Sequence, residues 1–303
     1  MPSERPARVP GLSPSRAKDY MQCPLLYRFR VVDRLPEPPS PAAVRGTLVH
    51  AVLERLFDLP RPDRTSDAAV GLLPAAWADL VAAEPSCGEV LAEMTSLDAW
   101  FEEAAGLLRT YFTLEDPTRL EPSDREMAVA VQLEDGPQLR GIVDRLDVAP
   151  NGALRIVDYK TGRSPRAGFE ADALFQMRFY ALVLSRMLGR MPAMLQLVYL
   201  KDGTVLRHEP TEAELRVTEQ RVRAVWDSIR RSAESGTWES RPSRLCDWCS
   251  HQALCPSFGG TPPPVPEGAV GRALGMRGPA GSQQVEDLAA CDSPDLSQAD
   301  LLE

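Results

Sequence analysis

Lysine is scarce in this chain of 303 residues: of 34 basic side chains, only Lys18, Lys160 and Lys201 are lysines. No lysine follows a glycine, which excludes the phosphate-binding motif G-x-x-x-x-G-K-[ST]. Any nucleotide-driven motor that works with this chain must therefore be a separate protein. Lys160 is the informative exception, because it lies two residues after Asp158 at the end of an apolar run.

The sequence also lacks long apolar runs and a recognisable targeting segment. The opening residues, MPSERPARVPGLSPS, have no apolar core of a signal peptide, and no run reaches the roughly 18 apolar residues that cross a bilayer. We therefore expect a cytoplasmic protein without a membrane partner. The net charge of −9 does not exclude a nucleic-acid partner, because binding depends on a local basic stripe and not on the total.

Short β-rich runs and helical patterns predict a mixed α/β sandwich, with a mixed central sheet flanked by helices. The β-rich runs cover residues 126–133, 138–149, 154–160, 193–200 and 204–210, and the clearest later helices cover 171–188 and 211–236. Residues 60–120 read as an inserted, mostly helical region. We expect one folded domain over 12–260, a disordered N-terminus over 1–11 and a disordered acidic tail over 261–303.

Two carboxylates and the lysine form the first candidate site. Asp144 lies on the second β-rich run, while Asp158 and Lys160 share one face of the third because side chains alternate along a strand. A tight turn joins the two runs, so the acids can converge at one end of the sheet. With the backbone carbonyl of Tyr159 they would make an oxygen site for Mg²⁺ or Mn²⁺. The alternative is a solvated ion pair, which an isolated D-x-K usually is.

His50 is the second candidate ligand. It is one of three histidines and lies among apolar residues on a predicted helix. A lone histidine in such a place usually packs in the core, but imidazole also suits Mn²⁺ as a ligand. On the helix predicted at 171–188, Gln176 and Tyr180 are spaced i, i+4 and so share one face. They are either part of the site or ordinary polar helix positions.

Taken together, these motifs resemble the RecB-type nucleases of the PD-(D/E)XK superfamily over roughly residues 12–256. The motifs are G-x-x-x-H (Gly46 to His50), G-x-x-D-R-x-D (Gly141 to Asp147), D-Y-K-T-G (Asp158 to Gly162) and Q-x-x-x-Y (Gln176 and Tyr180). The resemblance implies a restriction-endonuclease-like core. It also implies His50, Asp144, Asp158 and the Tyr159 carbonyl as metal ligands, a catalytic Lys160, and Gln176 and Tyr180 in support or in contact with DNA. Glu126 and Arg145 also fall where the family often has such residues, but they receive no role.

The six cysteines include a C-x2-C-x5-C triplet, Cys246, Cys249 and Cys255. Three clustered thiols in a cytosolic protein favour a metal over disulfides, and Cys23 is the candidate fourth ligand. Four thiolates suit a [4Fe–4S] cluster or Zn²⁺, and a ligand more than 200 residues away favours the cluster. AddB-like subunits and CRISPR-adaptation nucleases, which this arrangement resembles, carry such a cluster. His251 could replace a thiol in the zinc alternative, and Cys87 and Cys291 are left over.

The leading hypothesis is a Mg²⁺- or Mn²⁺-dependent, exonuclease-like enzyme that acts on single-stranded DNA or DNA ends in repair or recombination. The alternative is a non-catalytic DNA-binding scaffold, stabilised by an iron–sulfur cluster, in a complex with a separate helicase. Divalent-metal affinity at Asp144 and Asp158 discriminates between them. Exonuclease or endonuclease action, strand polarity, and the choice between RNA and DNA stay open.

Overall fold

The computed structural model describes residues 11–37, 40–92, 96–166 and 170–275. Several helices begin at the capping signals that their sequences carry. Ser13 caps the first helix ahead of Pro14, and Thr211 and Glu214 form a complete capping box. The helices are α1 (Pro14–Gln22), α2 (Pro24–Tyr27), α3 (Pro41–Leu56), α4 (Ser66–Gly71), α5 (Leu73–Ala83), α6 (Ser86–Ala92), α7 (Leu97–Leu114), α8 (Ala171–Leu188), α9 (Glu212–Ser235) and α10 (Ala269–Leu274).

Five strands form one mixed sheet in the order β1-β2-β3-β4-β5. Their bounds are β1 (Asp124–Gln132), β2 (Gln138–Val148), β3 (Leu154–Lys160), β4 (Met194–Tyr199) and β5 (Thr204–His208). The β3–β4 pair is parallel and the other neighbours are antiparallel, so α8 is the crossover between β3 and β4. The predicted mixed sheet flanked by helices is confirmed.

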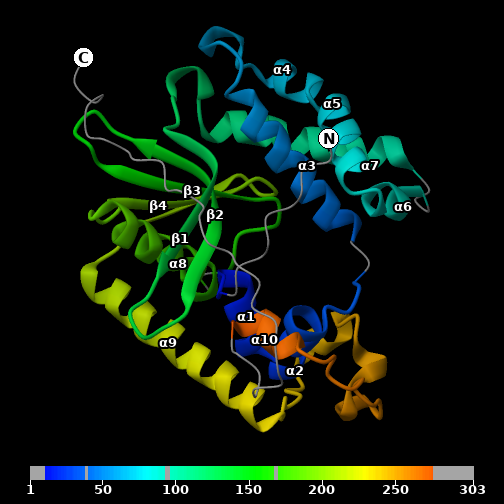
Figure 1. The fold of residues 1–303 in the computed structure, drawn as a ribbon. Helices are drawn as coiled ribbons and strands as arrows, with labels where there is room; N and C mark the ends of the chain where they lie inside the picture. Colours follow the sequence, from blue (N-terminus) through cyan, green and yellow to red (C-terminus); the bar gives the residue numbers. More distant parts are fainter. Residues whose placement is uncertain (1–10, 38–39, 93–95, 167–169, 276–303) are drawn as a thin grey trace, which may run out of the picture.

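Each face of the sheet has its own apolar core. Leu154 and Ile156 of β3 pack in the core that contains α8 and α9, whereas Val157 and Tyr159 pack in the core that contains α3 and α7. Figure 1 shows α3 to α7 as a helical group on one side of the sheet and α9 as a long helix on the other. The residues at 60–120 that were expected to be an inserted helical region thus cover one face of the sheet.

The alternation of side chains breaks where Glu126 and Asp144 lie opposite each other. Val143 and Leu146 both lie in the core under α8, although residues three apart on a regular strand face opposite ways. On β1, Glu126 has a φ of 44°, a left-handed conformation that is uncommon for a residue other than glycine. Backbone pairing is regular on either side of this point. Both strands therefore turn over at these two acidic residues, which means that the alternation of their side chains between the two faces shifts by one position.

The two ends of the described chain meet below the sheet (Figure 1). The Tyr20 hydroxyl of α1 donates to the Ser228 carbonyl of α9 at 2.7 Å, and the Leu25 amide donates to the Glu239 carbonyl at 3.1 Å. A short π-helical segment, Arg28–Asp33, follows α2 and packs against α10. The N-terminal helices are thereby fixed to the C-terminal part of the fold.

Part of the segment that was expected to be a disordered tail, residues 261–275, contains helix α10. Helix α10 buries Ala269, Ala273 and Leu274 in the main core, because these small and apolar side chains fit against the π-helical segment. The remainder of the predicted acidic tail, 276–303, and residues 1–10 of the predicted disordered N-terminus lie outside the described residues.

Within the described residues, one segment, Ser66–Ala83, meets the length and composition of a membrane span. The segment is divided into α4 and α5 at Leu72 and contains Asp67 and Asp79. The absence of a membrane partner therefore stays a prediction.

Candidate functional site

Asp144 lies where β2 and β3 part. The regular β2–β3 register ends at the pair Arg145 and Val157, so Asp144 and Asp158, the next positions, are not paired through their backbones. The Tyr159 amide instead donates to Asp144 Oδ2 at 2.8 Å. The Asp144 carboxylate thus takes the place of a backbone hydrogen bond at the point where β2 and β3 separate. The contact with the Tyr159 amide fixes the position of this carboxylate.

His50 reaches the same point from α3. Gly46, one turn earlier, lies close to β3: a Cβ there would be 3.2 Å from Thr161 Oγ1. His50 Nε2 lies 3.0 Å from the Tyr159 carbonyl oxygen. A carbonyl can only accept, so Nε2 carries the proton and Nδ1 is left facing the acids. Nδ1 is 3.4 Å from Asp144 Oδ2 and 3.9 Å from Glu126 Oε1.

Glu126 is the residue that sequence reasoning left without a role. Within the described ranges, one group of three potential metal ligands has its ligand atoms within 4.8 Å of one another. It consists of His50, Glu126 and Asp144. The unusual backbone of Glu126 brings its side chain to this group, and strained conformations of this kind concentrate at functional sites. Its sequence signals are its place at the start of the first β-rich run and its position where the resembling family often has such a residue.

The charges in this group favour a cation. Burial raises the pKa of Asp144 to about 7, and the neighbouring charge of Asp158 adds to the rise. Burial lowers the pKa of His50, but a hydrogen bond with Glu126 and the charges of Asp144 and Asp158 outweigh it, so this pKa lies above its usual value. The group therefore takes up protons readily, and a divalent ion can relieve the same excess of negative charge.

Asp158, Lys160, Gln176 and Tyr180 form the other half of the site. Lys160 Nζ lies 2.5 Å from Asp158 Oδ2 and donates to Gln176 Oε1 at 3.0 Å. Gln176 Nε2 donates to Asp158 Oδ1 at 2.9 Å and lies 3.3 Å from the Tyr180 hydroxyl. Asp158 is 2% exposed, so its charge is held by these partners and not by water. The i, i+4 pair of α8 thus faces the D-Y-K segment.

The structure brings together every predicted residue of the nuclease motifs, but in two adjoining groups. Asp158 and the Tyr159 carbonyl were expected among the metal ligands. In the structure Asp158 pairs with Lys160, and the carbonyl faces His50. Asp144 and Asp158 lie near enough for the charge of Asp158 to act on Asp144. Their roles as ligands stay predictions.

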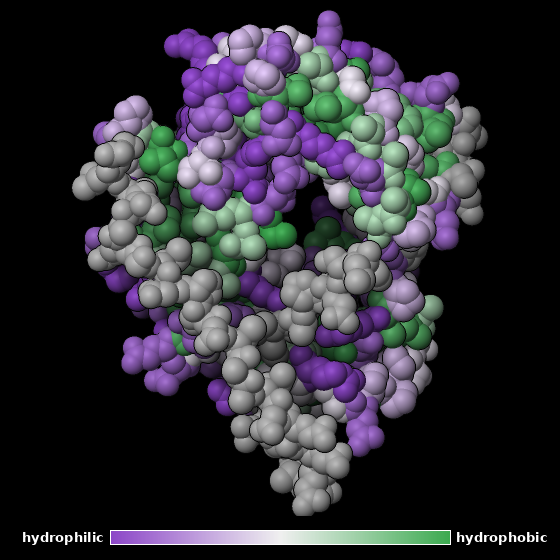
Figure 2. Space-filling view, turned by 45° about the horizontal axis from the view of Figure 1, so that its top comes forward, coloured by the Kyte–Doolittle hydropathy of each residue, from purple (hydrophilic) through white to green (hydrophobic). Residues whose placement is uncertain are grey.

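An open cleft reaches the first group. Small residues of α3, including Ala42, Ala43 and Gly46, line it together with His50 and Glu126. The space-filling view shows a hollow near the centre of the face, with hydrophilic residues along its upper rim (Figure 2). These side chains are therefore reached from the surface without passing through a closed cavity.

All four predicted sulfur ligands line one pocket between α1 and the C-terminal segment. Backbone amides point at two of the sulfurs: Arg241 N lies 3.4 Å from Cys23 Sγ, and Ser243 N lies 3.3 Å from Cys246 Sγ. Burial raises the pKa of the Cys249 thiol, and Cys246 and Cys23 lie near enough to add to the rise. Cys87 is buried in α6, and Cys291 lies outside the described residues.

The spacing of these thiols does not form a zinc cage. Zinc–sulfur bonds of about 2.3 Å place tetrahedral sulfurs about 3.8 Å apart. Within the part of the chain that the structure describes, no three thiols lie within 4.8 Å of one another. His251 also lines this pocket, and its Nε2 pairs with Glu37 Oε1 at 2.7 Å, so only its Nδ1 is left for the zinc alternative.

Comparison with known proteins supports the fold and the family. A model of the PD-(D/E)XK nuclease superfamily matches residues 11–256. Among solved structures, the "Putative exonuclease" from Eubacterium rectale shares 15% identity over 80% of this chain and 87% of that one, with a TM-score of 0.54. SSO0001, at 14% identity over 82% of this chain and 86% of that one, has a TM-score of 0.38. No curated protein matches the sequence.

Proposed function

Because the chain belongs to the PD-(D/E)XK nuclease superfamily, we propose that it is a metal-dependent deoxyribonuclease that hydrolyses phosphodiester bonds in single-stranded DNA or at DNA ends. The observation that carries the proposal is the convergence of Asp144, Asp158 and Lys160 at the point where β2 and β3 part. A structural ion pair would need only Asp158 and Lys160, whereas this arrangement adds a second, crowded acid and a histidine.

The residues that would hold Mg²⁺ or Mn²⁺ are His50, Asp144 and Glu126, joined by Asp158 and the Tyr159 carbonyl that the family resemblance implies. A divalent ion bound there supplies Lewis-acid stabilisation of a phosphate oxygen and lowers the pKa of a bound water. The donor set fits such an ion, because it combines an imidazole with carboxylates. Burial and the neighbouring charge of Asp158 make it costly for Asp144 to ionise, and a bound cation would offset this cost.

Lys160 is the proposed catalytic cation. Asp158 and Gln176 hold two of the three donors of its ammonium group, which leaves the third for a phosphate oxygen or the attacking water. Such a fixed charge can stabilise the negative charge that develops on the phosphate. Gln176 orients the lysine, and Tyr180 holds Gln176 in turn. A compact ammonium suits this role better than a planar guanidinium.

The proposal includes a [4Fe–4S] cluster held by Cys23, Cys246, Cys249 and Cys255. Its support is the shared pocket and the amides directed at two sulfurs. Amide-to-sulfur hydrogen bonds are among the contacts by which proteins tune such clusters. The proposed role is structural, because the pocket joins the first helices to the last part of the fold.

The proposed function is tested with end-labelled single- and double-stranded DNA and circular single strands, incubated anaerobically with Mn²⁺. We expect the wild type to degrade linear single strands and the Lys160→Ala variant to lose about 100-fold or more of this activity. Lys201→Ala is the matched control, because Lys201 is exposed in the β4–β5 turn and should leave activity unchanged.

Each outcome of this assay decides one question. Equal activity of the wild type and Lys160→Ala, or no activity in either, would reject catalysis and favour the scaffold alternative. Degradation of circular single strands would replace the exonuclease by an endonuclease.

A further inference from the structure

Tyr159 connects the proposed metal site with the opposite face of the sheet. Its amide donates to Asp144 and its carbonyl faces His50, so its peptide groups orient two of the proposed ligands. Its side chain points the other way, into the core with α3 and α7, where it is 4% exposed. The placement of this residue therefore bears on both ligands at once.

β2 does not hold Tyr159 through the ordinary ladder. The regular β2–β3 register ends two residues earlier, at Val157, while the parallel pairing with β4 continues to Lys160. On the β2 side, two side-chain contacts take its place. One is the Asp144 carboxylate, and the other is Arg145, whose Nη1 donates to the Tyr159 hydroxyl at 2.6 Å.

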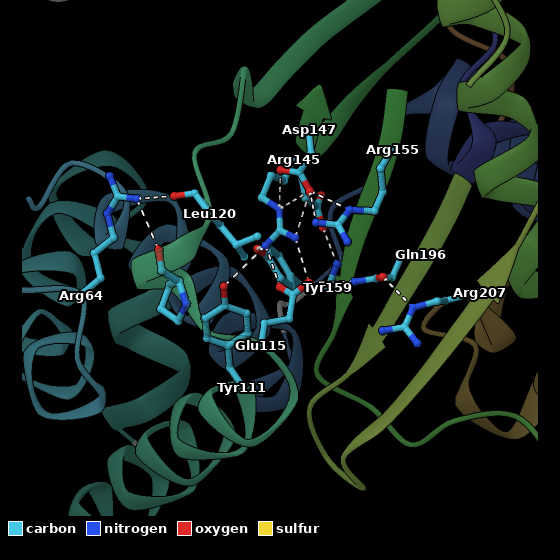
Figure 3. Close-up of polar contacts among 12 residues, drawn as sticks. Arg64, Tyr111, Glu115, Leu120, Arg145, Asp147, Arg155, Tyr159, Gln196 and Arg207 are labelled. Atoms are coloured by element: carbon cyan, nitrogen blue, oxygen red, sulfur yellow. Dashed lines mark hydrogen bonds and ion pairs between the residues drawn. The ribbon is translucent and has the colours of Figure 1, made fainter. Parts of the chain in front are cut away.

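Arg145 is itself held on every side (Figure 3). Its two terminal nitrogens donate to the Glu115 carboxylate at 2.8 and 2.9 Å, and its Nε lies 3.1 Å from Asp147 Oδ1. The guanidinium packs over the ring of Tyr159, and Arg145 is 0% exposed. A bidentate pair of this kind fixes direction as well as distance.

Further contacts lock the partners of Arg145. Gln196 donates to Glu115 at 2.8 Å, and Arg207 donates to Gln196 at 3.1 Å. Burial would raise the pKa of Glu115, but the hydrogen bonds and charge of Arg145 outweigh it and hold this pKa below its usual value. Buried ion pairs add little net stability over apolar side chains of similar volume, so the geometry that the network fixes is the better reason for it.

We infer that Arg145 is a positioning residue for the metal site: through the Tyr159 hydroxyl it fixes the peptide groups that orient Asp144 and His50 from the opposite face of the sheet. The inference rests on the proposed function, because it concerns the same metal. It assigns the arginine of the G-x-x-D-R-x-D motif a task that neither its sequence position nor its distance from the ligands reveals.

The test measures Mn²⁺ binding by electron paramagnetic resonance and calorimetry, together with the melting temperature, without DNA. Tyr159→Phe removes the hydroxyl and keeps the ring. We expect its Mn²⁺ dissociation constant to rise about tenfold, as is typical when a residue that orients a ligand is lost. Tyr111→Phe is the control within the same network. It removes a hydroxyl that lies 3.5 Å from the same guanidinium and keeps the ring that packs against Tyr159.

A double-mutant cycle tests the route through Tyr159. If Arg145 acts through the hydroxyl, Arg145→Lys with Tyr159→Phe should bind Mn²⁺ no more weakly than Arg145→Lys alone. Equal Mn²⁺ affinity of the wild type and Tyr159→Phe, or equal losses in Tyr159→Phe and Tyr111→Phe, would overturn the inference and leave the proposed function standing. A wild type that binds Mn²⁺ no better than Asp144→Asn would overturn the proposed function itself.

Discussion

The surroundings of Asp144 disfavour the ionised form of its carboxyl group. Burial and the charge of Asp158 raise its pKa to about 7 from a usual value of 3.8. Between these values the folded, metal-free protein holds a proton that the unfolded chain has lost, so stability falls as the pH rises through this interval. The raised pKa of His50 acts in the same direction, because its stabilising proton is lost as the pH rises through the folded-state pKa.

We therefore expect Asp144→Asn to flatten the pH dependence of stability. In metal-free buffer, the free energy of unfolding of the wild type should fall by roughly 2 to 4 kcal/mol between pH 4.5 and pH 7, and the fall should be much smaller in the variant. Urea denaturation at a series of pH values measures it. Asp227→Asn, an exposed change on α9, should keep the wild-type slope. Equal slopes in the wild type and Asp144→Asn would contradict the raised pKa.

Among the elements, β2 and α8 meet most closely at the glycine of the G-x-x-D-R-x-D motif. A Cβ at Gly141 would lie 2.5 Å from Tyr180 Cε1. The Tyr180 ring therefore packs directly on the backbone of β2, and from there its hydroxyl holds Gln176. The glycine is required for close approach and not for an unusual backbone angle.

Gly141→Ala should therefore act on stability and on the site together. We expect a loss of about 1 to 3 kcal/mol from overpacking, and a fall in nuclease activity at temperatures where the variant is still folded, because a displaced Tyr180 releases Gln176. Thermal unfolding and the DNA assay measure the two effects. Gly106→Ala on α7 is the control, since nothing lies within 4 Å of a Cβ there and the change should stabilise the helix. Wild-type stability and activity in Gly141→Ala would rule out this packing role.

The sequence predicted the elements because their signals are local. Capping at Ser13 and Thr211, alternation along the strands and the β4–β5 turn each depend on a few neighbouring residues. The turnover at Glu126 and Asp144 has no such signal, because it depends on a left-handed backbone at a residue other than glycine and on the match between two strands. Glu126 was therefore left without a role, and the predicted ligand set lacked one of the three atoms that lie closest together.

Over the whole molecule, the thiol pocket joins residues that are far apart in the sequence. Cys23 follows α1, and the other three thiols lie beyond α9. A cluster bound there would close a loop around the entire sheet, and cross-links across loops of this length restrict the unfolded chain the most.

Removal of one thiol should therefore affect stability more than chemistry. We expect anaerobically purified wild type to be brown, and Cys249→Ser to lose the visible thiolate-to-iron absorption and about 3 to 5 kcal/mol of stability. Absorption spectra, iron and sulfide analysis and thermal unfolding measure this. Cys87→Ser, which changes a buried cysteine outside the pocket, should keep the colour. Colourless wild-type protein with stoichiometric zinc would defeat the cluster proposal.

The contact between the two ends of the fold also sets an order of events during synthesis. Arg241 donates to the Met21 carbonyl across 220 residues of sequence. At about 5 to 20 residues per second, the first helix leaves the ribosome roughly 10 to 45 s before its partner exists. Until then Tyr20, Leu25 and Cys23 lack the neighbours that later cover them, so the nascent chain should depend on chaperones most strongly at its beginning.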